Sequence, residues 1–302
     1  MTTNGRWTEQ DIPDQSGKIA IVTGANSGIG YATSQELARK GAQIIMACRS
    51  MDKGQTAAQQ IRREFPAASV EVMALDLSDL SSVRHFAEGF NSQHEKLDLL
   101  INNAGVMAIP LARTPDGFEM QFGTNHLGHF ALTGLLLERI LATPAARVVT
   151  VSSGAHRRGQ IDFDDLNSER SYSRYGAYSQ SKLANLLFTY ELGRRFQASG
   201  VDAISVAAHP GWTATNLQRG LIRFLSRLVS QNQAMGALPT LYAATAPDVQ
   251  SGDYYGPDGF RETRGYPTKV PSTARSHDRE VAARLWTVSE ELTGVPFTAL
   301  AA

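Results

Sequence analysis

The sequence predicts an α/β protein in which helices cover both faces of one doubly wound parallel sheet. Short continuous apolar runs are typical of parallel strands buried on both faces. Stretches of helical periodicity separate these runs, which favours right-handed crossovers within one sheet. A glycine-rich turn also follows the first run and opens a helix. The predicted strands are residues 18–23, 43–47, 69–75, 97–101, 147–151 and 203–208.

Composition predicts one large domain. The chain has 302 residues, of which 42% are hydrophobic, and no Pro/Gly/Ser-rich linker or repeat divides it. We expect a short polar extension at residues 1–16 and a single domain at residues 17–302. About residues 154–175 and 212–235 break the alternation and are the expected substrate-binding segments. Within the second, the apolar residues of 221–229 have one-sided helical spacing, which indicates either a helix packed on the body or a lid over an apolar ligand.

Charge and cysteine content narrow the class of protein. The formal net charge is +0 with no long run of one sign, so no nucleic-acid partner and no anionic membrane surface is expected. The single cysteine, Cys48, cannot form an internal disulfide and fits a reducing compartment. The polar N-terminal residues lack the apolar core of a signal peptide, and no apolar run approaches the ~18 residues of a membrane span. These features predict a soluble cytoplasmic protein.

The turn after the first predicted strand has the glycine spacing of a phosphate-binding turn. Gly24 permits the tight turn, Gly28 lets the backbone approach a pyrophosphate, and Gly30 allows close helix packing. The following helix presents free N–H groups and its positive dipole end to the phosphates. A plain strand-to-helix turn is the alternative. The predicted cofactor-binding residues here are Gly24, Asn26, Ser27, Gly28, Ile29 and Gly30.

Residues after the second and third predicted strands are expected to contact the adenosine half of a dinucleotide. Arg49 lies where an acidic residue would bind a free ribose 2′-OH, whereas an arginine suits a 2′-phosphate. Arg49 therefore favours NADP(H) over NAD(H), with a solvated arginine as the alternative. Asp76 and Leu77 are placed to meet the adenine ring, although Asp76 could equally cap a helix starting near Ser78.

Tyr178 and Lys182 lie four residues apart in a predicted helix, so their side chains share one face. An unperturbed tyrosine has a pKa near 10, which is too high for easy proton exchange at neutral pH. An adjacent ammonium favours the phenolate, so we expect the pKa of Tyr178 to be lowered. Such pairs also occur by chance on solvated helices. The motifs upstream of this pair, at residues 24–30, 102–105 and 151–153, favour a catalytic role for it over a chance pairing.

Motifs occur at residues 23–30, 102–105, 125, 151–153, 178–182 and 210–211. In kind and in order along the chain, they resemble the motifs of the short-chain dehydrogenases/reductases. Local features at residues 47–49, 125–130 and 181–185 resemble the retinol dehydrogenase and protochlorophyllide reductase branch. The resemblance extends from about residue 17 to residue 296. It implies a Rossmann fold and hydride transfer between a nicotinamide cofactor and a carbonyl or alcohol.

The resemblance also implies four catalytic residues. Tyr178 would protonate the carbonyl oxygen, and Lys182 would lower the phenol pKa and hold the nicotinamide ribose. Ser153, rather than Ser152, would hydrogen-bond the substrate oxygen. Asn125 would interrupt a helix and hold a water that links Lys182 to solvent. A strand-end cap for Ser153 and a helix-surface amide for Asn125 are the alternatives. The further implied cofactor contacts are Asn103, Ala104, Gly105, Pro210, Gly211 and Thr213.

Three other features are assigned to packing or assembly. His126 and His129 are three apart on a helix but lack further metal ligands, so no metal is expected. Met107 reads as a core residue. Family members often form homodimers or homotetramers through the helices that carry Asn125 and Tyr178. A C-terminal segment such as residues 261–302, with a helix at 276–292 folding back on the body, can disfavour that assembly.

The sequence thus predicts an oxidoreductase that transfers a hydride between NADP(H) and an apolar carbonyl or alcohol. Two alternatives stay open. One is an NADP(H)-binding regulatory protein without turnover. The other is an enzyme similar to light-dependent protochlorophyllide reductase.

Overall fold

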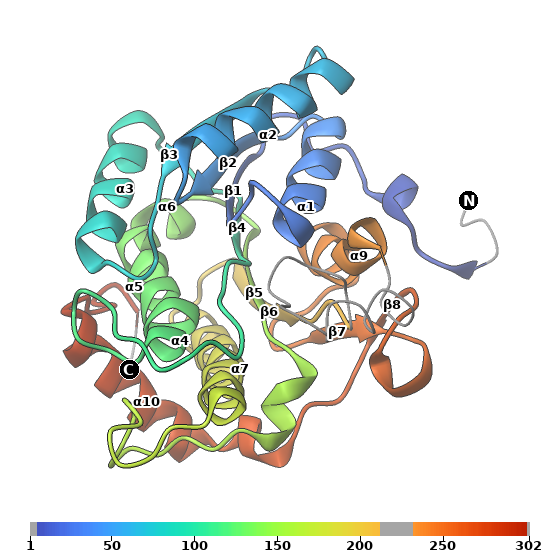
Figure 1. The fold of residues 1–302 in the computed structure, drawn as a ribbon. Helices are drawn as coiled ribbons and strands as arrows, with labels where there is room; N and C mark the ends of the chain where they lie inside the picture. Colours follow the sequence, from blue (N-terminus) through green and yellow to red (C-terminus); the bar gives the residue numbers. More distant parts are fainter. Residues whose placement is uncertain (1–4, 212–231, 301–302) are drawn as a thin grey trace.

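The computed structural model describes residues 5–211 and 232–300, which form one eight-stranded sheet between two layers of helices (Figure 1). The strand order is β3-β2-β1-β4-β5-β6-β7-β8. Only β8 runs antiparallel to its neighbour among these strands. The predicted doubly wound α/β fold is therefore confirmed. The strands are β1 Ile19–Thr23, β2 Gln43–Cys48, β3 Val70–Ala74, β4 Leu99–Asn102, β5 Ala146–Val151, β6 Ala203–Ala208, β7 Tyr254–Pro257 and β8 Pro267–Lys269.

Each face of the sheet has its own apolar core. Helices α1, α2 and α9 cover one face, whereas α3, α5, α6 and α7 cover the other. Side chains alternate along β1, where Ala20 and Val22 enter the first core and Ile19 and Ile21 the second. The helices are α1 Gly28–Arg39, α2 Met51–Glu64, α3 Leu80–Gln93, α4 Met120–Phe122, α5 Gly128–Leu135, α6 Leu137–Leu141, α7 Arg174–Ala198, α9 Gln233–Thr245 and α10 Arg279–Thr293.

All six predicted strands are present, with ends that differ by at most two residues from the expected ones. Strands β7 and β8 were not expected. They are short and contain tyrosine, glycine and proline rather than a continuous aliphatic run. They extend the sheet beyond β6, so that the turns around them reach the end of the cavity described below.

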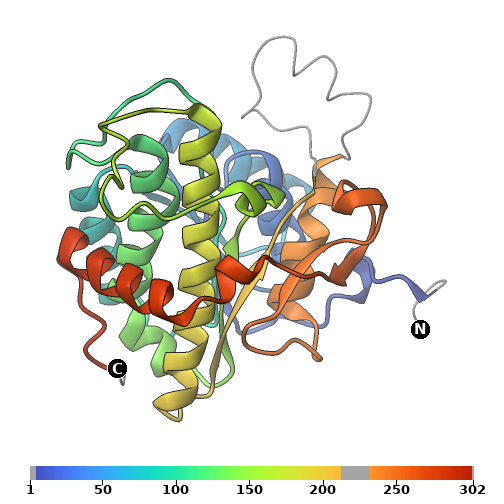
Figure 2. The ribbon, with the colours of Figure 1, turned by 90° about the horizontal axis from the view of Figure 1, so that it is seen from below.

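The C-terminal helix folds back on the body as predicted. Trp286 of α10 stacks on Phe188 of α7 with ring centroids 5.8 Å apart, and its edge meets Phe130 of α5 at 5.2 Å. Figure 2 shows α10 lying against the helix layer that contains α7. Within this layer, α5 and α7 are therefore partly covered by α10.

Across residues 5–211 and 232–300, no helix has the length and apolar character that crossing a bilayer requires.

Candidate active site

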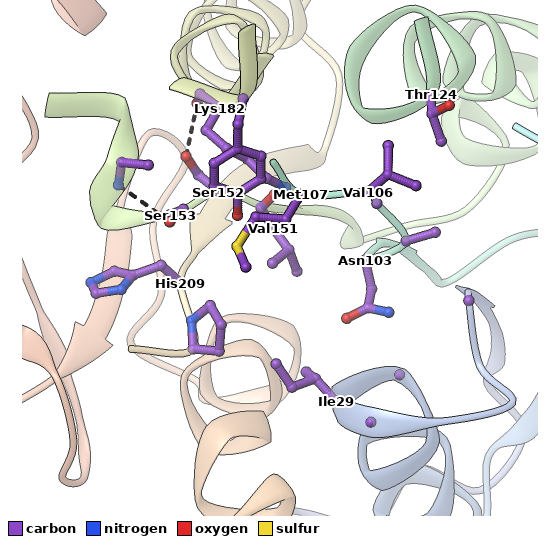
Figure 3. Close-up of a pocket in the computed structure, with 18 of the residues that line it drawn as sticks. Ile29, Asn103, Val106, Met107, Thr124, Val151, Ser152, Ser153, Lys182 and His209 are labelled. Atoms are coloured by element: carbon purple, nitrogen blue, oxygen red, sulfur yellow. Dashed lines mark hydrogen bonds between the residues drawn. The ribbon is translucent and has the colours of Figure 1, made fainter. Parts of the chain in front are cut away.

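A cavity of about 1150 Å³ opens at the carboxyl ends of the parallel strands, the edge at which ligands bind in open α/β sheets. Turns after β1 to β6 all contribute to its lining. Figure 3 shows lining residues near the ends of β1, β4, β5 and β6, including Ile29, Asn103, Ser153 and His209. The predicted residues that the fold brings together here are Gly24, Asn26, Ser27, Gly28, Ile29, Gly30, Arg49, Asp76, Leu77, Asn103, Ala104, Gly105, Ser153, Tyr178, Lys182, Pro210 and Gly211. Of the remaining two, Asn125 is buried behind this lining, and Thr213 lies outside the described residues, as do residues 221–229.

The turn between β1 and α1 has glycines at positions where the backbone conformation or close packing disfavours a side chain. Gly24 and Gly28 have φ values of +65° and +62°, a region that side chains disfavour. A Cβ at Gly30 would lie 2.5 Å from the Gly24 carbonyl oxygen. Ser27 is the N-cap of α1, yet its side chain makes no capping hydrogen bond. The first N–H groups of α1 are thus without a side-chain cap, which fits a bound anion.

Residues 102–105 join the ends of β4 and β1. Asn103 and Ala104 each donate a backbone N–H to Thr23 Oγ1 at 2.9 Å, and Asn103 Nδ2 donates to the Thr23 carbonyl at 2.8 Å. Thr23 Oγ1 also lies 2.9 Å from His129 Nε2. These bonds hold the two central strand ends at a fixed separation beneath the cavity.

The two histidines of the helix take part in packing. His129 Nδ1 lies 3.0 Å from the Asn125 carbonyl, and His126 Nε2 lies 2.9 Å from Ser289 Oγ. Burial lowers the pKa of His126 to about 3 and that of His129 to about 4, so both rings are neutral at physiological pH. Within the described part of the chain, no three histidine, cysteine or acidic side chains gather as a metal site.

Asn125 lies in a π-helical turn, Gly123–Leu127, that separates α4 from α5. Its Oδ1 accepts the Val106 N–H at 2.8 Å. Its Nδ2 donates to the Val106 carbonyl and to Ser181 Oγ, each at 2.9 Å. The side chain is fully buried, so the surface-amide alternative is wrong, and the helix is interrupted at the expected place. Asn125 thereby ties the loop after β4 to α7.

Tyr178 and Lys182 lie on one face of α7. Lys182 Nζ donates to the Val151 carbonyl at 3.0 Å and lies 5.8 Å from the centroid of the Tyr178 ring. Burial lowers the pKa of Lys182 to about 8. The expected lowering of the Tyr178 pKa is wrong for this structure, because burial raises it and a hydrogen bond with Ser153 only partly opposes that rise. The phenol is therefore protonated at neutral pH.

The two serines that follow β5 have different environments. Ser152 is buried and donates its hydroxyl to the Lys182 carbonyl at 2.8 Å, which anchors α7 to the strand. Ser153 faces the cavity and accepts the Ala155 N–H at 3.2 Å as the N-cap of the 3₁₀-helix η4, Gly154–Arg158. Ser153 is thus both the strand-end cap and the serine that reaches Tyr178.

Two other expectations are corrected. Asp76 does not cap the next helix, since Asp79 caps α3 and Asp76 Oδ1 instead accepts the Ser78 N–H at 3.0 Å. Met107 lines the cavity instead of the core (Figure 3), because the loop after β4 turns toward the strand ends.

Several cavity residues were not predicted from the sequence. Lys53 follows Arg49 by four residues, a spacing from which it could have been found. Arg157 and Tyr175 lie in the expected substrate-binding segment 154–175 but were not singled out there, and His209 directly precedes Pro210. Glu262 comes from a segment without a recognisable motif.

The buried ammonium of Lys182 is expected to lower the free energy of unfolding. We expect Lys182→Met to raise the free energy of unfolding by roughly 1–3 kcal/mol at pH 7, because the folded state no longer buries a charge. The Val151 carbonyl keeps a hydrogen bond from Asn185 Nδ2 at 3.2 Å. Between pH 8 and 10 the unfolded wild type holds a proton that the folded state releases, so its stability should rise with pH. Urea titrations of both proteins across this range test both effects. A variant that is less stable, or that shows the same rise, contradicts the assignment.

The chain belongs to the short chain dehydrogenase family, whose model matches residues 18–224. This is a family of oxidoreductases, and the curated relatives narrow the likeness to retinol dehydrogenases. Mouse retinol dehydrogenase 12 is 46% identical over 295 residues, 95% of this chain and 89% of that protein. Human retinol dehydrogenase 13 is 46% identical over 293 residues, 92% and 85% of the two chains. A crystal structure of an uncharacterized protein from Mycobacterium paratuberculosis is 48% identical, with a TM-score of 0.83 over 97% of this chain and 99% of that chain.

Proposed function

We propose that the protein transfers a hydride between NADP(H) and an apolar carbonyl or alcohol, with Tyr178 as the general acid and base. The observation that carries this proposal is the meeting of Ser153, Tyr178 and Lys182 in the same cavity as the phosphate-binding turn. The relatives named retinol dehydrogenases support a long apolar aldehyde or alcohol as the class of substrate.

The side chains of the site divide the chemistry among them. A bound NADPH would supply the hydride for the carbonyl carbon. Tyr178 gives its phenolic proton to the carbonyl oxygen, and the Ser153 hydroxyl hydrogen-bonds the same oxygen as charge develops on it. The Lys182 ammonium stabilises the phenolate that remains, and its hydrogen bond to the Val151 carbonyl fixes its direction. Asn125 holds Val106 and Ser181, and it would also place the water that links Lys182 to solvent.

The preference for NADP(H) rests on the charges at the adenosine end. Arg49 is exposed beyond β2, and Lys53 lies in the first turn of α2. Among the described residues that line the cavity, the acidic side chains are Asp76 and Glu262, and neither lies in the turn directly after β2. A 2′-phosphate would therefore meet two cations and no carboxylate at the position that selects between the cofactors.

NADPH oxidation by the purified protein tests the function. We expect turnover with long apolar aldehydes or ketones that exceeds turnover with short polar ones, and a preference for NADPH over NADH. Tight binding of NADPH, without its oxidation in the presence of any carbonyl, would instead favour an NADP(H)-binding regulatory protein without turnover.

The position of α10 predicts the oligomeric state. Because Trp286 and its neighbours cover α5 and α7, we expect no pairing of chains through those helices. Sedimentation equilibrium should return the mass of one chain. A dimer with cross-links between the α7 helices of two chains contradicts this prediction.

A further inference from the structure

A strained turn forms part of the cavity lining. In the 3₁₀ segment η5, Phe260–Glu262, Arg261 and Glu262 have φ values of +52° and +56°. Two consecutive residues with side chains in the left-handed region are unfavourable and persist only where their surroundings hold them. Both residues line the cavity, and Glu262 contacts Arg157 of the turn that Ser153 caps. The strain therefore lies near Ser153, which marks the proposed substrate end.

The Glu262 carboxylate holds two walls of that end. Its Oε1 accepts Arg157 Nη2 at 2.7 Å, and its Oε2 lies 3.1 Å from His209 Nε2. Arg157 belongs to η4, the turn that Ser153 caps, and also donates to the Pro271 carbonyl at 3.3 Å. His209 directly precedes Pro210 at the end of β6. One carboxylate thus connects the serine-bearing turn with the turn after β6.

Backbone packing reinforces the same connection. A Cβ at Gly211 would lie 2.6 Å from the Thr263 carbonyl oxygen, so the strained turn packs directly on Gly211. A Cβ at Gly256 of β7 would collide with the His209 ring. The His209 ring therefore occupies space that only a glycine leaves free. The unpredicted strand β7 supplies this glycine, which explains how the extra strands bear on the cavity.

A purely stabilising role does not account for this arrangement. The ion pair with Arg157 is partly solvated, with side chains 42% and 22% exposed, and such pairs contribute little to stability. The two left-handed residues cost stability. Both observations favour a geometric role at the substrate end.

We propose that Glu262 is a positioning residue, which, through Arg157 and His209, fixes the distance between the Ser153 turn and the Pro210–Gly211 turn. This inference rests on the proposed function, because the distance matters only if a substrate lies between these turns. A misplacement of about 1 Å at a reacting group can cost on the order of 100-fold in rate. Loss of the carboxylate acts on turnover and leaves the adenosine end of the cavity untouched.

A double-mutant cycle tests the proposal. Glu262→Ala and Arg157→Ala should each lower kcat about 10-fold, and the double variant should be no slower than the slower single variant, because both remove one connection. The Kd of NADPH from fluorescence titration should change less than about 2-fold in each variant, and the Tm of Arg157→Ala should hardly change, because its ion pair is partly solvated. Glu262→Gln, which keeps one acceptor oxygen, should recover part of the rate.

Arg113 and Glu169 supply the matched control. They form an exposed ion pair at 3.1 Å whose residues do not line the cavity. Glu169→Ala, Arg113→Ala and their double variant should retain wild-type kcat.

The outcomes separate this inference from the proposed function. Wild-type kcat in Glu262→Ala, additive losses in the cycle, or losses matched by the control pair would each overturn the positioning role. If the wild type reduces no carbonyl, the proposed function fails instead. Amide hydrogen exchange then tests whether Glu262 connects the two turns. Glu262→Ala should speed amide exchange within residues 154–158 and 209–211, whereas Glu169→Ala should not. Unchanged exchange in both variants would refute the connection itself.

Discussion

Replacing Tyr178 with phenylalanine should lower kcat by about 10²–10⁴, the range for loss of a positioned general acid. The phenol is 9% exposed, and burial raises its pKa, so at neutral pH it carries the proton that the carbonyl oxygen needs. The ring of phenylalanine fills the same space, so NADPH binding should be nearly unchanged. Steady-state kinetics and a fluorescence titration of NADPH measure the two effects on one protein preparation.

Tyr175 is the control for this substitution. It lies one turn earlier on α7 and lines the same cavity, but its side chain is 56% exposed. Tyr175→Phe should retain kcat within about 3-fold, because a solvated phenol at the mouth has no defined reacting partner. Equal kcat values for the two variants would remove Tyr178 from the mechanism.

Replacing Arg49 with alanine should weaken NADPH binding by roughly 1.5–3 kcal/mol, the range for hydrogen bonds to charged groups. This corresponds to about a 10- to 150-fold rise in Kd. NADH binding should be almost unchanged, since the free 2′-OH offers no phosphate to the guanidinium. Calorimetric titration of both cofactors measures the difference.

Arg63 supplies the comparison for this second substitution. It lies near the end of α2, is exposed, and is not among the cavity residues. Arg63→Ala should leave both Kd values unchanged. If Arg49→Ala weakens NADPH and NADH equally, Arg49 does not recognise a 2′-phosphate.

The sequence predicted those parts of the fold in which local pattern and tertiary environment agree. Five of the six predicted strands are almost wholly buried and largely aliphatic, and only the edge strand β3 is buried on one face alone. Gly24 and Gly28 have positive φ where only glycine is unstrained. Strands β7 and β8 lack that pattern. They form at the sheet edge by pairing with strands that already exist, so their sequences need little intrinsic β propensity.

The candidate site was predicted where residues occur in motifs, and was missed where contacts join distant segments. Arg157 and Glu262 are separated by 105 positions along the chain, and the local sequence around either residue does not predict their ion pair. The pKa of Tyr178 was misjudged because helical spacing reveals the nearby lysine but not the burial that raises the pKa. Desolvation is a property of the assembled fold.

The most direct test of hydride transfer uses NADPH that carries deuterium at the transferring position of the nicotinamide. The wild-type protein is mixed with this cofactor and an apolar aldehyde, and the product alcohol is examined by mass spectrometry. The proposed function predicts one deuterium on the former carbonyl carbon, and about 10²- to 10⁴-fold slower formation of the deuterated alcohol with Tyr178→Phe. Oxidation of the cofactor without deuterium in the alcohol would contradict direct transfer in this cavity.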